Sequence, residues 1–214
     1  MGMVGIVGYT LNGELVYGIL QAIDAGGSTT IHAFGAYFGL AVSFVISKKS
    51  KPDSATPTTY GNIIYAMIGT LFLWMYWPSI NAGYFPTNGF QRSLIINNTI
   101  ICLTGSCLST FATSSILRKK FNMEDIINAT LAGGVAIGAS SGVVANMGVS
   151  LTIGIIAGFV SNIAYAKLMH KLEHGFLGIH DTCGIHNLHG IPGLLGGLIS
   201  AMVIASYQTW PGLD

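Results

Sequence analysis

Two histidines lie inside strongly apolar stretches and occupy the same place in a repeated pattern. His32 follows Asp24 by eight residues, and His189 follows Asp181 by eight residues, so both segments read D-x-x-G-x-x-x-x-H. A neutral imidazole can donate one hydrogen bond and accept another. Ionisable side chains inside a membrane are costly and usually line a pathway or a polar cavity. The pattern therefore predicts that His32 and His189 form the centre of a conduction path for a small solute.

The composition indicates that lipid surrounds these histidines. Of the 214 residues, 51% are hydrophobic and only 8% are charged, whereas roughly a quarter of the residues in a soluble domain are charged. The net charge of +1 gives no indication of nucleic-acid binding. The three cysteines form neither a disulfide framework nor a zinc-binding pattern. The sequence thus predicts an all-α polytopic membrane protein without a metal or another cofactor.

The histidines belong to segments that are long enough to cross a membrane. A spanning helix needs about 20 mostly apolar residues, and about seven segments meet this requirement. The first is weakened by Asn12 and Glu14, and the fifth is short and rich in glycine. The predicted spans cover residues 2–22, 28–47, 61–80, 93–117, 126–142, 147–170 and 184–206.

Positive charges give these spans a direction. Eight of the nine Lys and Arg residues lie after the second and fourth spans or at the end of the sixth, and cytoplasmic loops carry such an excess. These loops are predicted to face the cytoplasm, which places Asp24 at the outer face and Asp181 at the inner face. The eight residues are Lys48, Lys49, Lys51, Arg118, Lys119, Lys120, Lys167 and Lys171.

The two Asp–His segments open the second and the seventh spans, which are five spans apart. Because an odd number of spans reverses the direction of the chain, the two segments form an inverted repeat. Inverted repeats are typical of channels and transporters whose functional site lies near the midplane. Eight residues of helix rise about 12 Å, so each histidine reaches well into a hydrocarbon core of about 30 Å.

Long segments around these residues resemble one known family. The sequence is similar to the ammonium transporter/Rhesus superfamily, and more closely to its Rh branch. The resemblance implies a homotrimer in the plasma membrane, with one narrow pore per subunit that conducts ammonia or ammonium, and it also allows CO2 or methylammonium. The segments that carry it are DAGGSTTIHAFGAYFGL (24–40), GTLFLWMYWPSIN (69–81), NATLAGGVAIG (128–138) and HDTCGIHNLHGIPGLLGG (180–197).

The resemblance also assigns roles to individual residues. The paired pore histidines of the family correspond to His32 and His189, and its aspartate before the first of them corresponds to Asp24. Asp181 matches the second, mainly structural aspartate. The second phenylalanine of the family's outer gate corresponds to Ile80, so this chain departs from the family there. Glu14 corresponds to an acidic residue of the outer vestibule in Rh proteins.

The resemblance implies that the chain is part of a longer fold. Family members have 11–12 spans in an inverted repeat, so this sequence is expected to be an internal fragment that lacks roughly the first three spans and the last. By this mapping residues 1–214 form a single transmembrane domain. Residues 1–47 are the end of the first repeat, and residues 61–206 are the second.

Two side-chain roles stay open at this point. Asp24 either attracts a cation by its charge or caps the helix that begins after it. Trp74, Tyr76 and Trp77 either attract a cation in a vestibule through their rings or anchor the protein at the membrane interface.

Other functions compete with conduction. A non-transporting structural or sensor subunit of the same fold is the first alternative, and the altered gate position Ile80 motivates it. A membrane metalloprotein is the second, although no further ligand stands at helical spacing around His32. An enzyme is not expected, because the sequence has no G-x-S-x-G motif, no P-loop and no dinucleotide fingerprint.

Overall fold

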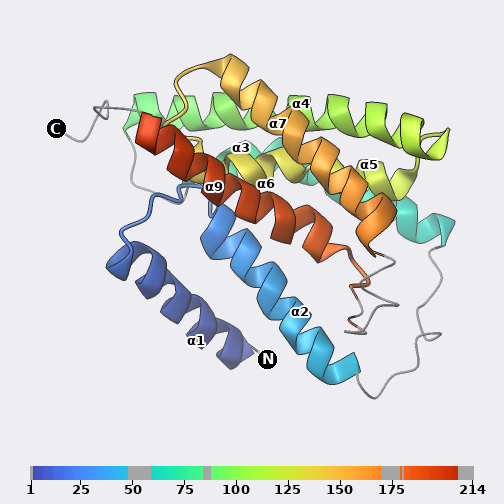
Figure 1. Ribbon diagram of the computed structural model, residues 1–214, viewed down its shortest axis with the longest axis horizontal. Helices are drawn as coiled ribbons and strands as arrows, with labels where there is room; N and C mark the ends of the chain where they lie inside the picture. The colour runs from blue at the N-terminus through green and yellow to red at the C-terminus, as the bar shows by residue number, and fades with distance from the viewer. Residues whose placement is uncertain (1, 48–58, 84–87, 170–178, 180, 207–214) are drawn as a thin grey trace.

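The described part of the chain is a bundle of helices without strands. The computed structural model describes residues 2–47, 59–83, 88–169, 179 and 181–206. The bundle packs long helices around a segment of short ones (Figure 1). In chain order the elements are α1 (Gly2–Gly13), η1 (Glu14–Ile19), η2 (Ser28–Ala33), α2 (Phe34–Ser47), α3 (Tyr60–Gly83), α4 (Gly89–Arg118), α5 (Met123–Ala129), α6 (Ala132–Ile137), η4 (Gly138–Ser140), α7 (Met147–Ile163), η5 (Ala164–Leu168), η6 (His186–Gly190) and α9 (Ile191–Ser206). Of the η elements, η4 is a 3₁₀-helix and the others are π-helices.

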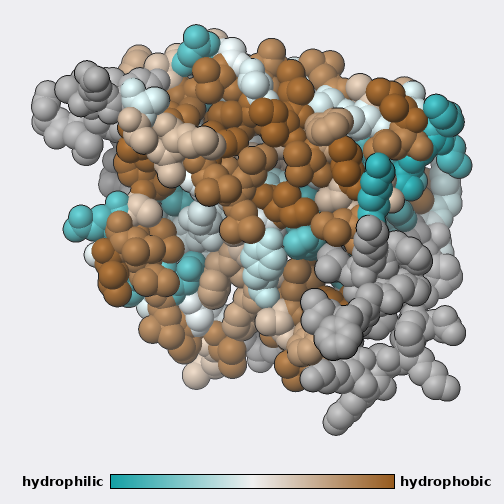
Figure 2. All heavy atoms as spheres, in the orientation of Figure 1, coloured by the Kyte–Doolittle hydropathy of each residue, from teal (hydrophilic) through white to brown (hydrophobic). Residues whose placement is uncertain are grey.

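Five helices of the described chain are long and apolar enough to cross a membrane, which confirms the predicted multi-pass class. Their surfaces carry many exposed large apolar side chains, and apolar residues dominate the face seen in Figure 2. Such a surface is stable in lipid, because exposing this much apolar area to water costs free energy. The five spans are Ser28–Ile46, Tyr60–Gly83, Gly89–Arg118, Met147–Leu168 and His186–Ser206.

The other two predicted spans have different forms. The first, predicted at 2–22, is the helix α1 continued by the π-helix η1 as far as Ile19. The fifth, predicted at 126–142, is divided into α5, α6 and η4, and nearly all of its residues are buried. Glycine lowers helix stability and allows close backbone approach, so this glycine-rich segment is a buried, interrupted helix among the longer ones.

Close packing of α4 against α7 forms the core on which the other helices lie. Gly154 lies against the carbonyl oxygen of Cys102, and Gly158 lies against the carbonyl oxygen of Ser106. A side chain at either glycine would collide with backbone, which cannot move as a flexible side chain can. Small residues allow such close helix contacts in membranes, so Gly154 and Gly158 serve helix packing.

The helices alternate in direction, so that α2, α4 and α7 all end at the right side of the bundle in Figure 1. The positive loops predicted to share one face would therefore lie together. At this end Arg118 closes α4 and forms an ion pair of 2.9 Å with the buried Asp125 of α5. Lys48, Lys49, Lys51 and Lys171 lie outside the described residues. The assignment of this end to the cytoplasm stays a prediction.

The interrupted segment also binds the turn that precedes η2. The backbone N–H of Gly26 donates to the carbonyl oxygen of Gly138 at 2.7 Å. The Ser28 hydroxyl donates to the carbonyl oxygen of Val135 at 2.5 Å and accepts from the N–H of Ala139 at 2.7 Å. Breaks in a helix at membrane depth are tolerated when the freed backbone groups find partners inside the protein. The hydrogen bonds at the break around η4 therefore connect the two halves of the predicted repeat.

Candidate functional site

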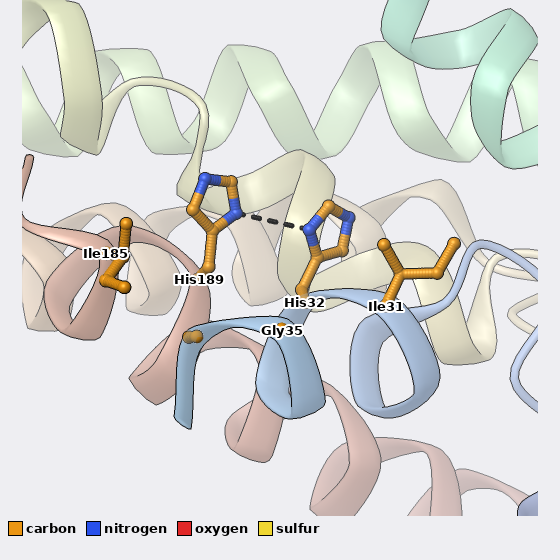
Figure 3. Close-up of a pocket in the computed structure, with 6 residues that line it drawn as sticks. Ile31, His32, Gly35, Ile185 and His189 are labelled. Carbon is orange, nitrogen blue, oxygen red and sulfur yellow. Dashed lines mark hydrogen bonds between the residues drawn. The ribbon is translucent and has the colours of Figure 1, made fainter. Parts of the chain in front are cut away.

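His32 and His189 lie side by side, one from each half of the predicted repeat. Their Nδ1 atoms are 3.1 Å apart, and their rings are stacked with centroids 5.1 Å apart and an interplanar angle of 11°. Figure 3 shows the two side chains pointing toward one another from the π-helices η2 and η6. One Nδ1 must donate and the other must accept, so the neutral pair has one Nε2–H donor and one Nε2 acceptor left. We call these two residues the histidine pair.

A pocket of about 230 Å³ opens beside the histidine pair. Besides the two imidazoles, its walls are aliphatic or small, so the imidazoles supply the side-chain hydrogen-bonding groups in an otherwise apolar lining. A small neutral molecule with donors and acceptors can bind such a lining, whereas a bare ion would lose its hydration there. The lining residues are Ile31, His32, Gly35, Ala36, Ile185 and His189 (Figure 3).

The aspartate before the first histidine caps the beginning of η2. Asp24 is only 1% exposed, and its Oδ2 accepts from the backbone N–H groups of Thr29 at 3.0 Å and Thr30 at 2.7 Å. The hydroxyls of Thr29 and Thr30 donate to the same oxygen. These contacts satisfy backbone donors that have no partner at a helix N-terminus. The other oxygen, Oδ1, is buried without a partner among the described residues.

The second aspartate repeats this arrangement at η6. Asp181 is 2% exposed, and its carboxylate accepts from the backbone N–H groups of Ile185 at 2.8 Å and His186 at 2.9 Å. In each turn the glycine of the D-x-x-G pattern has a positive φ, +73° at Gly27 and +67° at Gly184. An L side chain rarely adopts this conformation. The same short motif therefore builds the same turn, cap and π-helix in front of each histidine.

Trp77 lies behind the first histidine rather than at a surface. Its indole stacks on His32 with ring centroids 5.4 Å apart and an angle of 19°. It is 3% exposed, and its Nε1 has no hydrogen-bond partner among the described residues. Trp77 therefore belongs to the buried support of the histidine pair.

The remaining predicted site residues lie outside the lining of this pocket. Ile80, at the predicted gate position, lies near the end of α3 and is 49% exposed. Glu14 begins η1 and is exposed. His186, which is not one of the predicted site residues, contacts the ring of Tyr37 edge-on and does not line the pocket either. The structure brings His32, His189 and Trp77 together. It places each aspartate at the N-terminal end of the π-helix that carries a histidine.

Several residues that support the site have no part in the D-x-x-G-x-x-x-x-H pattern. Asn12 Nδ2 donates to the carbonyl oxygen of Thr30 at 2.8 Å. The hydroxyls of Tyr17 and Tyr165 reach the two Asp–Gly turns. The polar Asn12, which weakened the prediction of the first span, is the one sequence signal that pointed to such a contact. The tyrosines carry no comparable signal, because tyrosine is common in membrane spans.

The arrangement gives no support to a metal centre. Within the described ranges, no group of three or more His, Cys, Asp and Glu side chains could hold a metal ion. The three cysteines are free. The direct contact of the two imidazoles also occupies the nitrogens that face each other.

Comparison with known proteins identifies the family. The sequence profile of the Ammonium Transporter Family matches residues 3–212. The chain is 44% identical to Ammonium transporter Rh type C of Rattus norvegicus, covering 94% of this chain and 41% of that protein. It is 45% identical to Ammonium transporter Rh type A of Canis lupus familiaris, covering 95% and 50%. The Rh50 structure of Nitrosomonas europaea matches with a TM-score of 0.85 at 35% identity, covering 91% of this chain and 52% of that one. The chain thus spans about half the length of these relatives, and it belongs to the Ammonium Transporter Family, with Rh-type proteins among its relatives.

Proposed function

We propose that the protein conducts ammonia through a narrow pore whose centre is the histidine pair. The observation that carries this proposal is the 3.1 Å contact between the Nδ1 atoms of His32 and His189 beside an otherwise apolar pocket. Membership of the Ammonium Transporter Family and the Rh-type relatives support the solute class. CO2 and methylammonium are further candidate solutes.

The chemistry of the pocket favours a neutral solute over an ion. Transfer of a bare charge from water into an apolar lining is expensive, and two adjacent imidazoles oppose a further positive charge. Ammonium would therefore break one N–H bond at the outer mouth and leave the proton in water. Ammonia would then pass the pair, donating to the free Nε2 and accepting from the Nε2–H. It would take up a proton again from water at the inner side.

The two aspartates act in this proposal as caps that hold the histidine helices. Asp24 is buried and its Oδ2 is fully used by Thr29 and Thr30, so a role in attracting a hydrated cation at the surface is less well supported. Asp181 has the same position in front of His189. The carboxylates fix the turns, and the turns fix the imidazoles.

The parts of the pore outside the histidine pair follow from the family. We place the outer gate at Ile80, where an aliphatic side chain replaces the family's aromatic ring, and the outer vestibule near Glu14. Residues 1–47 would be the end of the first repeat and residues 61–206 the second, within a homotrimer of the plasma membrane. The matched turns at Gly27 and Gly184 support the division into repeats.

Flux through liposomes tests the proposal. The full-length protein is reconstituted, an ammonium gradient is imposed, and a dye reports the alkalinisation that entering ammonia causes. His32→Ala and His189→Ala are expected to lower the flux to that of protein-free vesicles. His186→Ala is the matched control, because it removes an imidazole from η6 that does not line the pocket. Wild-type flux and selectivity in both His32→Ala and His189→Ala would contradict the proposal.

The same assay separates conduction from the alternative of a structural or sensor subunit. The altered gate residue Ile80 is the observation that favours this alternative. A well-folded wild-type protein that conducts no ammonia, methylammonium or CO2 above protein-free vesicles would support it.

A further inference from the structure

Each half of the repeat has a tyrosine in a π-helical turn at the end of the preceding span. Tyr17 lies in η1, before the turn at Asp24, and Tyr165 lies in η5, before the turn at Asp181. Single π-helical turns are rare and often occur at functional sites. The two tyrosines stand at different sequence distances from their aspartates, so their correspondence is visible only in space.

Tyr17 connects η1 to the turn in front of His32. Its hydroxyl donates to the carbonyl oxygen of Asp24 at 3.1 Å and lies 2.8 Å from Oγ1 of Thr30. Thr30 in turn donates to the Asp24 carboxylate. The hydroxyl of Tyr17 therefore contacts both the backbone of the turn and the first residues of η2.

Tyr165 makes a comparable connection to the other turn, although it bonds the last residue of the D-x-x-G pattern rather than the first. Its hydroxyl donates to the carbonyl oxygen of Gly184 at 2.9 Å. The ring lies directly on Gly184, since a β-carbon there would be 2.5 Å from the Cζ atom of Tyr165. The two connections lie at opposite ends of the bundle, between α1 and α2 on the left and between α7 and α9 on the right of Figure 1.

The contacted turns are joined rigidly to the histidines. The backbone N–H of His32 donates to the carbonyl oxygen of Gly27 at 2.9 Å. The carbonyl oxygen of Gly184 accepts from Asn187 at 3.1 Å and Leu188 at 3.0 Å. A shift of either turn would therefore move its histidine, and a hydrogen bond of 3.1 Å weakens steeply when its length or angle changes.

From this geometry we propose that Tyr17 and Tyr165 are matched positioning residues that set the contact between the two imidazoles, one from each face of the membrane. Their hydroxyls lock the Asp–Gly turns onto the preceding spans. The inference rests on the proposed function for its effect on conduction, but the positioning itself can be measured on the histidines.

The test removes one hydroxyl at a time. Tyr17→Phe and Tyr165→Phe are compared with Tyr65→Phe, which removes a hydroxyl from a 77% exposed tyrosine of α3. Nitrogen NMR of ¹⁵N-histidine-labelled chain reports which Nδ1 of the pair donates and which accepts. The flux of ammonia and of the larger methylammonium is measured in liposomes with the full-length protein.

The positioning role predicts changes in both the NMR spectrum of the histidines and the flux. The His32 and His189 signals shift or lose their donor–acceptor difference in both variants, while the control keeps the wild-type spectrum. Ammonia flux falls about five-fold per variant, as expected when one hydrogen bond of average strength is lost, and the ratio of ammonia to methylammonium flux changes. A purely structural role would lower both fluxes by one factor and keep their ratio.

The outcomes separate this inference from the proposed function. Wild-type histidine signals in folded Tyr17→Phe and Tyr165→Phe proteins overturn the inference, whatever the flux. Shifted signals support it even if the His32→Ala protein conducts normally, in which case the proposed function fails alone. If Tyr165→Phe does not fold, Tyr17→Phe decides, because Tyr17 is only half-buried and lies outside the core.

Discussion

Gly134 of α6 is the position where one added methyl group should disturb the support of the histidine pair. A β-carbon at Gly134 would lie 2.7 Å from Nε1, 2.8 Å from Cε2 and 2.9 Å from Cδ1 of Trp77. The Trp77 ring stacks on His32 and is almost fully buried, so it cannot move away without displacing its neighbours. The substitution Gly134→Ala should therefore displace the indole and disturb its stacking on His32.

The magnitude follows from two opposing effects. Overpacking a core costs about 1–3 kcal/mol, while alanine in place of a helical glycine returns about 0.5–1 kcal/mol. The net destabilisation lies between about 0 and 2.5 kcal/mol, with a central value of about 1 kcal/mol. That central value corresponds to a fall in melting temperature of roughly 2–4 °C for a chain of this size. The matched control is Gly142→Ala in the same segment. Its β-carbon would meet Ile95 at 3.6 and 3.7 Å, an ordinary contact, so its stability should stay within about 0.5 kcal/mol of wild type.

Tryptophan fluorescence during thermal unfolding in detergent measures both variants, and the liposome assay measures their ammonia flux at equal amounts of folded protein. Gly134→Ala should melt earlier and conduct less, and Gly142→Ala should resemble wild type in both measurements. Equal melting temperatures for the two variants would refute the steric reasoning. Lower stability with wild-type flux would refute the link from Trp77 to His32.

Three further substitutions test other parts of the argument. Asp24→Ala leaves the N–H groups of Thr29 and Thr30 unpaired and should lower stability by about 2–6 kcal/mol. Asp24→Asn keeps an acceptor, so it should melt close to wild type and conduct; a stable Asp24→Asn protein without flux would show that the charge itself is needed. Arg118→Ala removes two hydrogen bonds, of 2.9 and 3.0 Å, from the buried Asp125 and should lower the free energy of unfolding by about 1.5–3 kcal/mol. Arg118→Lys should lower it less. Equal melting temperatures of Arg118→Ala and wild type would contradict this. Ile80→Phe places an aromatic ring at the proposed gate position, which is half-exposed, so the melting temperature should hold while the ammonia-to-methylammonium flux ratio changes. An unchanged ratio argues against a gate there.

Much of the architecture was accessible from hydropathy because lipid imposes a simple rule on each segment. The five continuous spans agree with the predicted ranges within a few residues, since a long apolar run has no other stable form in a membrane. Hydropathy did not reveal that the segment 126–142 is interrupted. Its interruption depends on Gly133, Gly134 and Gly138 meeting α4, Trp77 and the turn at Gly26, and these neighbours are distant in sequence.

The repeated motif also encodes the local structure in front of the two histidines. A D-x-x-G turn is a local structure, because the aspartate caps backbone groups a few residues away and the glycine supplies a positive φ. Both turns have this form at Asp24 and Asp181. The motif did not show that the Asp24 carboxylate is fully buried, because burial depends on what packs around it. The exposure of Ile80 could not be inferred from its residue type for the same reason.

By itself, the sequence determined the membrane class, most spans and the pattern that builds the two matched turns, because composition, apolar length and turn chemistry act over short stretches of chain. Only the tertiary structure decided that His32 and His189 touch across 157 positions of sequence, that Trp77 stacks behind them, and that Tyr17 and Tyr165 hold the turns. These contacts depend on how closely the helices approach and at what angle they cross. That geometry is set by small residues packed against backbone at sites such as Gly154, and it is a property of all the helices together.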